Sequence, residues 1–334
     1  NVRLYFLDNK SEIIEKKGGK IFLNIEECDI KVILCKSIQL DEKNFLKILE
    51  QQNISKNHTI FIGAAKEKYL EGRISRSKKI INNEFKNLSL SDSMNILFNN
   101  DVDIIVNKAN KDLVLNYKNN LGRVIIYKSE INSWSIKMTN EIDNNKEDFN
   151  NIFNLTGCLT IIDSKIDNLN LTASNFNCED TINFIRSTGN ANTIKISDSK
   201  SDALDADFSN LYIKSLLINN SFNDCADFSF GEYQIQKAFL ISCGDKAISV
   251  GEKSNFKIND LNINNANIGV ASKDSSIVLV NKAEMNNLKY CLSSYKKKQE
   301  FNFSNLIVNN LRCENFSKKA DKDKYSTLNI KNEF

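Results

Sequence analysis

The chain has 334 residues, 41% of them hydrophobic and 26% charged, and its formal net charge is +3. This apolar content is enough for a sizeable core. No segment approaches the roughly 20 apolar residues of a membrane span, and no stretch is consistently basic. The composition therefore predicts neither a membrane span nor a nucleic-acid partner.

Residues 1–90 contain short apolar segments that share no common period. Strands are expected at 2–7, 20–25, 30–35 and 58–63. Residues 41–52 predict an amphipathic helix that Asp41 can cap. The order predicts a small α/β region, or alternatively a cap over the open end of the domain that follows. The single histidine, His58, precedes an apolar strand and is expected to be structural.

Residues 91–334 are expected to form the second domain. Short strands recur between about 95 and 140, and we interpret them as shorter or irregular first coils of a solenoid. The acidic and Asn-rich stretch 141–151 predicts a polar loop between coils.

A regular repeat runs through the rest of the chain, with a period of about 22 residues. Strand-like segments with a preceding turn align on Cys158, Asp180, Asp202, Asp224, Asp245, Asn267 and Lys289, whose numbers differ in turn by 22, 22, 22, 21, 22 and 22. Second strands recur between them at 192–199, 211–220, 233–242, 255–265 and 276–285. Each unit thus holds two or three strands joined by turns rich in Asn, Ser, Asp and Gly. The pattern predicts an all-β fold, a right-handed parallel β-helix.

Stacked coils would place equivalent residues in ladders. Two expected interior ladders are Ile182, Leu204, Ala226, Ala247, Gly269, Cys291 and Phe184, Ala206, Phe228, Ser249, Ala271, Ser293. Their members are small or apolar, as a solenoid interior requires. The chain has no proline, and its abundant Asn suits tight turns because Asn tolerates left-handed backbone.

The eight cysteines include no C-x-x-C pair, so the sequence predicts no zinc ribbon and no thioredoxin-like motif. Most lie beside apolar residues within the repeat units, and we interpret them as buried free thiols. Disulfides are the alternative, because an even number of cysteines in an exported protein favours them.

Acidic residues gather around one strand ladder of the repeat. They are Glu179, Asp180, Asp202, Asp205, Asp207, Asp224, Asp227, Asp245 and Glu252, with Lys246, Lys253, Lys273 and Lys296 on the later coils. Residues on neighbouring coils lie about 5 Å apart, so such a ladder can supply the carboxyl spacings of glycosidases. Crowded carboxylates also raise one another's pKa, which makes a general acid available. The alternatives are structural turn aspartates and calcium ligands.

The coils resemble the pectate-lyase-like β-helix proteins, and more closely the polygalacturonase-type glycoside hydrolases. That family carries NTD-x-x-D, GDDC, GHG-x-S-x-G and R-x-K segments on successive coils, and this chain has SDALD at 201–205, NDC at 223–225, DKAISVG at 245–251 and ASK at 271–273. Matching positions are Asp202, Asp205, Asp224, Ser249, Gly251 and Lys273. Asn223, Lys246 and Ala271 stand where the family has Asp, His and Arg. The resemblance implies a carbohydrate-active face with altered chemistry.

The predicted function is a polysaccharide-active enzyme, a glycoside hydrolase or a lyase, with Asp205 and Asp224 as the acid and base pair. The full set of predicted catalytic residues is Asp202, Asp205, Asp207, Asp224, Asp227, Asp245 and Lys246, the last as the base of an elimination. Lys253, Lys273 and Tyr295 are predicted to bind substrate, a polysaccharide of acidic type being one option. No cofactor is required, with calcium at the Asp cluster as the alternative. The competing hypothesis is a non-catalytic glycan-binding or structural cell-surface protein. In either case we expect an extracytoplasmic location: secreted, periplasmic or at the cell surface.

Overall fold

The computed structural model of the protein describes residues 5–6, 32–34, 60–62, 85–90, 94–140 and 155–334. The chain divides into two compact units, Asn1–Glu84 and Phe85–Phe334. In the first unit, β1 (Tyr5–Phe6) pairs antiparallel and β2 (Val32–Leu34) pairs parallel with β3 (Ile60–Ile62). These strands lie within three of the four segments expected there. The strand expected at 20–25, the helix at 41–52 and His58 fall outside the described residues, as does the expected loop at 141–151.

The described part of the second unit consists of strands and their turns. The early strands are β4 (Phe85–Leu90), β5 (Met94–Asn99), β6 (Val102–Asn107), β7 (Asp112–Tyr117), β8 (Val124–Tyr127), β9 (Glu130–Asn132) and β10 (Ser135–Asn140). Short and long strands then alternate: β11 (Gly157–Ile162), β12 (Lys165–Phe176), β13 (Asp180–Ile185), β14 (Thr188–Ser199), β15 (Asp202–Asp207), β16 (Asn210–Ser221) and β17 (Ala226–Ser229). The last coils are β18 (Glu232–Gly251), β19 (Asn255–Lys273), β20 (Ile277–Tyr295), β21 (Asn305–Lys322) and β22 (Thr327–Glu333).

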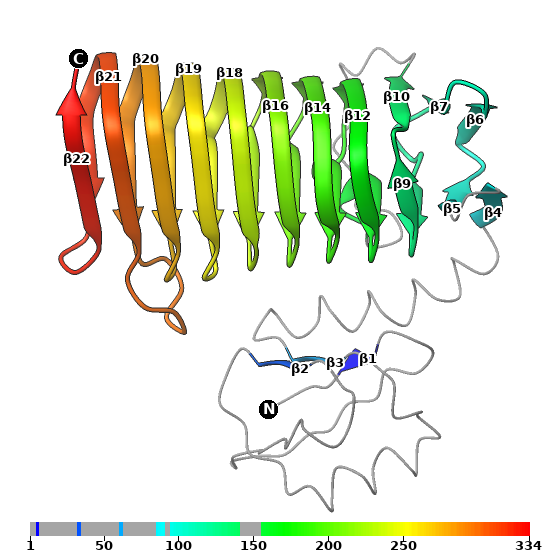
Figure 1. Ribbon diagram of the computed structural model, residues 1–334, viewed down its shortest axis with the longest axis horizontal. Coiled ribbons are helices and arrows are strands. Elements are labelled where there is room, and N and C mark those ends of the chain that lie inside the picture. The colour runs from blue at the N-terminus through cyan, green and yellow to red at the C-terminus, as the bar shows by residue number, and fades with distance from the viewer. Residues whose placement is uncertain (1–4, 7–31, 35–59, 63–84, 91–93, 141–154) are drawn as a thin grey trace, which may run out of the picture. The chain divides into compact units, whose positions relative to one another are not determined.

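Successive coils stack as a parallel β-helix, which Figure 1 shows as a row of long strands side by side. The pairs Asp180↔Asp202 and Leu204↔Ala226 show that one coil takes 22 residues. Between β20 and β21 the step lengthens to 28 residues, as from Asn281 to Asn309, because a loop follows Tyr295. The all-β fold and its coil length, both predicted from the sequence, are confirmed.

The predicted ladders are correct up to Ala226 and wrong beyond it. Ala226 pairs with Ile248 rather than Ala247, and Phe228 pairs with Val250 rather than Ser249. Regular stacking then continues, for example through Ile248↔Val270. The sequence alignment had assumed a coil of 21 residues from Asp224 to Asp245, whereas the coil takes 22. A slip of one residue along a strand moves each side chain from the interior face to the outer face or the reverse.

The strands expected to be short first coils are mostly not coils. β4 pairs antiparallel with β5, β5 with β8, and β6 with β7. Parallel stacking begins where β7 meets β10 and β8 meets β11. The reason is physical: the first coil leaves a row of unpaired backbone groups, and antiparallel strands cover that edge. Within the described residues no helix offers a long apolar stretch that could cross a membrane.

Left-handed residues occur at two positions of each coil. The long strands bend at a residue with positive φ, which is Asp198 or Ser242 on two coils and an asparagine, as expected of Asn, on the others: Asn175, Asn220, Asn265, Asn287 and Asn315. The short strands end in a second positive-φ position whose occupants are more varied: Asp163, Arg186, Phe208, Phe230, Glu252 and Asp274.

A ladder of buried serines follows that second bend. The hydroxyl of each serine accepts the backbone N–H of the serine one coil before it, as in Ser164 to Ser187 (3.3 Å) and Ser187 to Ser209 (3.0 Å). On the next coil Gly231 stands where the serine would be, so no serine hydroxyl is present to accept the backbone N–H of Ser209. The hydroxyl of Tyr233 accepts that N–H instead, at 3.3 Å. A Cβ at Gly231 would lie 2.0 Å from the Ser209 carbonyl oxygen, so only glycine fits.

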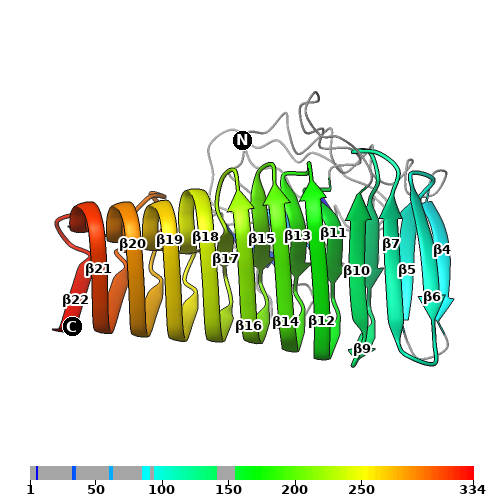
Figure 2. The same ribbon diagram turned by 90° about the horizontal axis from the view of Figure 1, so that it is seen from above.

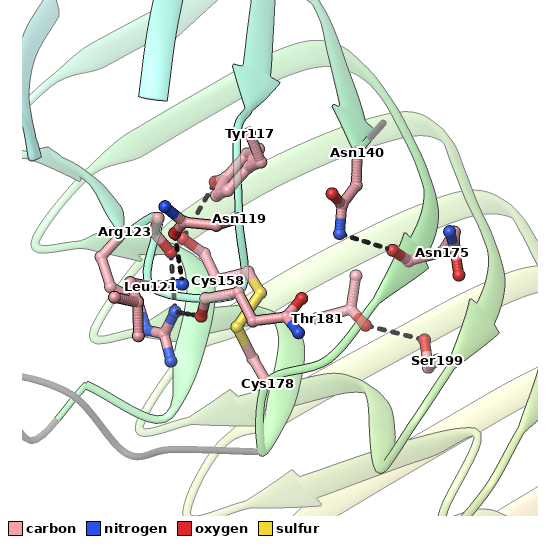
Figure 3. Close-up of a disulfide and its surroundings, with 12 residues drawn as sticks. Tyr117, Asn119, Leu121, Arg123, Asn140, Cys158, Asn175, Cys178, Thr181 and Ser199 are labelled. Atoms are coloured by element: carbon pink, nitrogen blue, oxygen red, sulfur yellow. Dashed lines mark hydrogen bonds between the residues drawn. A yellow bond between two sulfur atoms is a disulfide. The ribbon is translucent and has the colours of Figure 1, made fainter. Parts of the chain in front are cut away.

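Three disulfides join residues about one coil apart in sequence: Cys158–Cys178, Cys225–Cys243 and Cys291–Cys313. The interpretation of these six cysteines as free thiols is therefore wrong, while Cys28 and Cys35 lie outside the described residues. Figure 3 shows the first disulfide beneath Tyr117, whose hydroxyl donates to the Cys158 carbonyl at 2.9 Å. Cys158, Cys225 and Cys291 occupy the same position on every third coil. Disulfides persist in oxidising environments, which is where these bonds place the protein.

We expect Tyr233→Phe to lower the free energy of unfolding by about 1–3 kcal/mol, because the buried N–H of Ser209 loses its acceptor. Chemical denaturation monitored by circular dichroism measures this. Tyr212→Phe, at a half-buried tyrosine on the neighbouring β16, is the matched control and should have little effect. Equal stability of the two variants would show that the tyrosine hydroxyl does not replace a serine of the ladder.

We expect Cys158, Cys178, Cys225, Cys243, Cys291 and Cys313 to resist alkylation in the denatured, unreduced protein. Intact-mass measurement before and after reduction reads this directly. Each loop encloses about 20 residues, so replacing one pair by alanine should lower the unfolding free energy by about 3 kcal/mol. Alkylation of all six without reductant would contradict the pairing.

Candidate functional site

One outer surface of the coils gathers the acidic residues, and we call it the carboxylate face. It is formed by the outward side chains of β13, β15 and β17 and of the last residues of β18 and β19, strands that Figure 2 shows along one flank. In β15, Leu204 and Ala206 are fully buried in the core while Asp205 and Asp207 alternate outward and are half-buried. The members of the face are Asp180, Asn183, Asp202, Asp205, Asp207, Asp224, Asp227, Lys246, Ser249, Glu252 and Lys273.

Two columns of this face stack acids directly on acids. Asp180 lies in register with Asp202, and Asp205 with Asp227. Neighbouring strands are about 4.8 Å apart, so these carboxyl groups crowd one another. The first column continues through Asp224, whose Oδ1 accepts the backbone N–H of Lys246 at 2.9 Å.

Asp245 therefore does not continue the column of Asp180, Asp202 and Asp224, as the sequence alignment suggested; Lys246 occupies that place. Asp245 lies one residue earlier, at a position that is more exposed to solvent, and accepts from Asn267 at 3.1 Å. The correction has the same origin as the ladder slip, because the coil is one residue longer here than the acid spacing suggested.

Amide donors hold the carboxyl groups in place. The side-chain amide of Asn183 donates to Asp205 Oδ2 at 2.8 Å and to Asp180 Oδ2 at 3.2 Å. On the next coils Asp202 Oδ1 accepts from the backbone N–H of Asp224 at 2.8 Å and from the Asn223 amide at 2.6 Å. The face is thus an ordered network rather than a set of mobile surface acids.

Burial raises the pKa of several of these acids. It brings the pKa of Asp180, of Asp202 and of Asp207 each to about 7, the neighbouring carboxylates adding to the effect. Burial, followed by repulsion from Asp207 and Asp180, raises the pKa of Asp205 well above its usual range. A hydrogen bond with Asp205 opposes the rise in the pKa of Asp207. This shift favours the protonated form of Asp205, which can donate a hydrogen bond.

The lysines of the face are paired with carboxylates. Lys246 forms ion pairs with Asp224 (3.3 Å) and with Asp245. Burial alone would lower the pKa of Lys246, but Asp224 and Asp245 outweigh it and raise that pKa. The ammonium nitrogen of Lys273 lies 3.7 Å from Asp227 Oδ2. The side chain of Lys273 passes over Gly251, where an added Cβ would lie 3.4 Å from the lysine Cε.

Glu252 lies at the edge of the face and pairs with Lys298, a residue of the loop after β20. Burial would raise the pKa of Glu252, but hydrogen bonds from Lys298 and Ser229 outweigh it and lower that pKa. The inserted loop thus brings one further cation to the carboxylate face.

Aromatic rings border the face beyond Asp207. Phe208 and Phe230 occupy left-handed positions on successive coils and stack with centroids 4.5 Å apart and planes 11° apart. Phe301 of the loop after β20 lies 5.9 Å from Phe230. Bulky residues rarely adopt positive φ, and here the conformation directs a pair of rings to the edge of a polar surface. We call these three residues the aromatic shelf.

Three buried polar atoms of the face have no hydrogen-bond partner: Asn183 Oδ1, Asp227 Oδ1 and Ser249 Oγ. Ser249 is fully buried and pairs in register with Asp227. Unsatisfied buried groups cost free energy, so this part of the network is held at some cost to stability. Among the described residues, no three acidic, histidine or cysteine side chains converge as a metal cage would require.

Most of the predicted site residues share the face. Asp202, Asp205, Asp207, Asp224, Asp227, Lys246 and Lys273 lie on it, and Asp245 lies at its edge. Lys253 lies past the bend at Glu252 and is exposed. Tyr295 pairs in register with Lys273.

Sequence reasoning missed Asn183, Ser249 as an outward residue, and Lys298. Asn183 lies one coil before Asp205 and Ser249 one coil after Asp227, so a correct ladder would have found both. Lys298 belongs to an insertion and carries no periodic signal.

The fold and this surface define the class of the protein: a disulfide-linked parallel β-helix with a buried carboxyl network on one face. A family-model scan, a search of curated proteins and a search of solved structures each find no match. The resemblance to polygalacturonase-type hydrolases accordingly depends on the quoted segments alone.

The carboxylate face should make the protein more stable in mild acid than in mild base. A carboxyl group whose pKa is higher in the folded state contributes stability that is present below its unfolded pKa of about 4 and lost as the pH rises through about 7. We expect the melting temperature to fall between pH 5 and pH 8, where about 1 kcal/mol corresponds to about 2–4 °C. The pKa values of Asp245 and Glu252 are lowered, so the stability that these two groups contribute is lost only as the pH falls below this range.

Differential scanning calorimetry across that range measures the effect. Asp207→Asn should flatten the dependence, because a neutral amide neither ionises nor repels Asp205. Asp260→Asn, on the first half of β19 between Lys237 and Lys282, is the control and should retain it. A melting temperature that rises from pH 5 to pH 8 would contradict the raised pKa values.

Proposed function

We propose that the protein is a polysaccharide-active enzyme, a glycoside hydrolase whose acid is Asp205 and whose second carboxylate is Asp227. The observation that carries the proposal is their in-register position on adjacent coils. Burial and the neighbouring carboxylates raise the pKa of Asp205, which suits this residue to the role of the acid, while Asp227 faces the ammonium group of Lys273. An acid and a carboxylate are the pair that cleaves a glycosidic bond.

The second carboxylate thus differs from the expectation. Asp224 was predicted to complete the pair with Asp205, but its Oδ1 is occupied by the backbone and the ammonium group of Lys246. The side chain of Asp227 is 26% exposed, against 6% for that of Asp224. The more accessible carboxylate is the better nucleophile or base.

The spacing favours a retaining mechanism. Adjacent strands are about 4.8 Å apart, close to the roughly 5–5.5 Å carboxyl separation of retaining enzymes. Asp227 would attack the anomeric carbon as Asp205 gives its proton to the departing oxygen, and a glycosyl ester would form. Water would then cleave the ester, with Asp205 taking the proton back.

Hydrolysis is favoured over elimination by the state of Lys246. A lysine that serves as the base must lose its proton, whereas two carboxylates stabilise the ammonium form of Lys246. An oxidising environment agrees with an extracytoplasmic location, where polysaccharides are met.

The second candidate is non-catalytic glycan binding, and the aromatic shelf favours it. Stacked rings beside a polar surface offer an apolar platform for a sugar ring. In that reading the carboxyl groups bind hydroxyl groups and perform no chemistry.

A reducing-end assay on acidic, neutral and amino polysaccharides tests the proposal. Asp205→Asn and Asp227→Asn should each lower kcat by about 100-fold or more, while Asp260→Asn keeps full activity. Proton NMR of the first product should show the anomeric configuration of the substrate. If no polysaccharide is cut but a glycan binds to the wild type and to both variants, the binding function is the correct one.

A further inference from the structure

Positive charge gathers on the last coils of the solenoid. Residues 289–334 hold ten of the 45 Lys and Arg residues of the chain but only five of its 42 Asp and Glu residues. The rest of the chain therefore has more acidic than basic side chains. This end of the solenoid is the part of the protein that attracts anions.

Two turns of the last coils meet in a surface cluster that we call the basic platform: Lys296, Phe303, Lys324 and Tyr325. The first two belong to the loop after β20, which Figure 1 shows in orange, extending past the bends of the earlier coils. The rings of Phe303 and Tyr325 pack with centroids 4.7 Å apart. The ammonium nitrogen of Lys296 lies 5.7 Å from the centroid of the Phe303 ring, and that of Lys324 lies 5.0 Å from the centroid of the Tyr325 ring. Each ring of the platform thus has its own cation.

The rings of the platform are open to solvent. Phe303 is 42% exposed and Tyr325 is 60% exposed. A single exposed apolar side chain is ordinary, whereas aromatic rings that gather on the surface are typical of places where a partner binds. The packed pair therefore indicates a contact surface.

The charges of the platform are available to a partner. Other lysines of these coils, such as Lys298 and Lys318, form ion pairs with carboxylates. Among the described residues, neither Lys296 nor Lys324 has a carboxylate within the same reach. An anionic group of a partner can therefore pair with these two ammonium groups without breaking an ion pair of the protein.

Hydrogen bonds to the backbone fix the two turns. One carboxylate oxygen of Asp323 accepts the N–H of Lys296 at 2.7 Å, and its other oxygen accepts the N–H of Tyr325 at 3.0 Å. Asp274 accepts the N–H of Lys297 at 2.6 Å. The platform is accordingly preorganised, which reduces the entropy that is lost when a partner binds.

The platform continues the aromatic shelf. Phe301 lies 5.9 Å from Phe230 of the shelf, and Phe303, two residues later in the same loop, contacts Tyr325. Aromatic rings thus follow one another from the shelf to the last coils. Such a row fits an elongated polymer better than a small anion, and rings beside polar groups offer apolar platforms for sugar rings.

A lipid bilayer fits this surface less well. Rings that anchor a protein in a bilayer enter its apolar region. The ammonium groups of Lys296 and Lys324 lie close to the two rings, and carrying a charge into that region is costly. The arrangement therefore favours a ligand that presents sugar rings and anionic groups together in water.

We propose that the basic platform binds a polyanionic polysaccharide, whose sugar rings contact Phe303 and Tyr325 and whose anionic groups pair with Lys296 and Lys324. The platform lies at the coils of Ser293 and Asp321, three and four coils beyond Asp227. It retains the protein on the polymer and performs no chemistry. The inference thus goes beyond the proposed hydrolase and does not rest on it.

Four dextrans of matched length test the proposal: dextran sulfate, dextran phosphate, carboxymethyl dextran and unmodified dextran. Binding to the full chain is measured by isothermal titration calorimetry at about 50 mM salt, where charges are only partly screened. At least one anionic dextran should bind about tenfold or more tightly than unmodified dextran, and its affinity should fall as salt is added. The order among the three anionic dextrans identifies the anionic group that the platform prefers.

Variants of the lysines locate the site. Lys296→Gln combined with Lys324→Gln should weaken binding of the preferred dextran about tenfold, because each exposed ion pair contributes about threefold. Lys195→Gln combined with Lys214→Gln removes the same charge from exposed positions on β14 and β16, and this matched control should keep the affinity. Equal losses in the two double variants would show that only net charge matters and would overturn the proposal.

A second pair of variants tests the rings. Tyr325→Ala should weaken binding several-fold, whereas Phe222→Ala, at a side chain that is 79% exposed, should leave it unchanged. Melting temperatures establish that each variant is folded.

The remaining outcomes separate this proposal from others. Binding to none of the dextrans, or equal binding of the unmodified one, overturns it. Tighter binding of poly-L-glutamate or of anionic phospholipid vesicles than of any anionic dextran identifies an acidic protein or a membrane as the partner and overturns the polysaccharide assignment. Asp205→Asn, which tests the hydrolase, should leave all these affinities unchanged, so either proposal can fail without the other.

Discussion

The carboxylate face depends on coils that return to the same backbone position after 22 residues of the chain. Because each strand bonds in parallel register to its equivalent one coil later, any residue type that repeats at this interval becomes a continuous column. Apolar columns form the core, and the hydroxyl groups of the serine column accept hydrogen bonds from backbone N–H groups beside the bends. The same geometry forces Asp205 against Asp227 and Asp180 against Asp202, which no isolated strand could do.

Stacked carboxyl groups would normally repel, and the structure offsets this in three ways. Burial and repulsion favour the neutral form of Asp205, amide donors such as Asn183 hold other carboxyl groups, and buried lysines pair with Asp224 and Asp227. Such an arrangement stabilises the fold less than an apolar surface would. Its presence on one face therefore favours a functional over an architectural role.

Three departures from the regular pattern lie beside this face. Gly231 interrupts the serine column and is compensated by Tyr233, Gly251 clears the path of Lys273, and the loop after β20 contributes Lys298 and Phe301. Local rules tend to be violated at functional sites. These three departures lie beside the carboxylate face, so they favour the same surface as the functional site that the stacked carboxyl groups indicate.

The sequence by itself determined the parallel β-helix, its coil length, and the gathering of Asp202, Asp205, Asp207, Asp224 and Asp227 on one surface, because a regular period is a property of the chain that stacking makes spatial. Only the tertiary structure decided the rest. The spacing of acids suggested Asp245 in a column that Lys246 occupies, since hydrogen-bond register and not residue type sets the pairing. The antiparallel strands over the first coil and the ion pairs of Lys273 and Lys298 are contacts between distant residues with no periodic signal, so they exist only once the coils are stacked. The partner of each cysteine was likewise decided by the stacked coils.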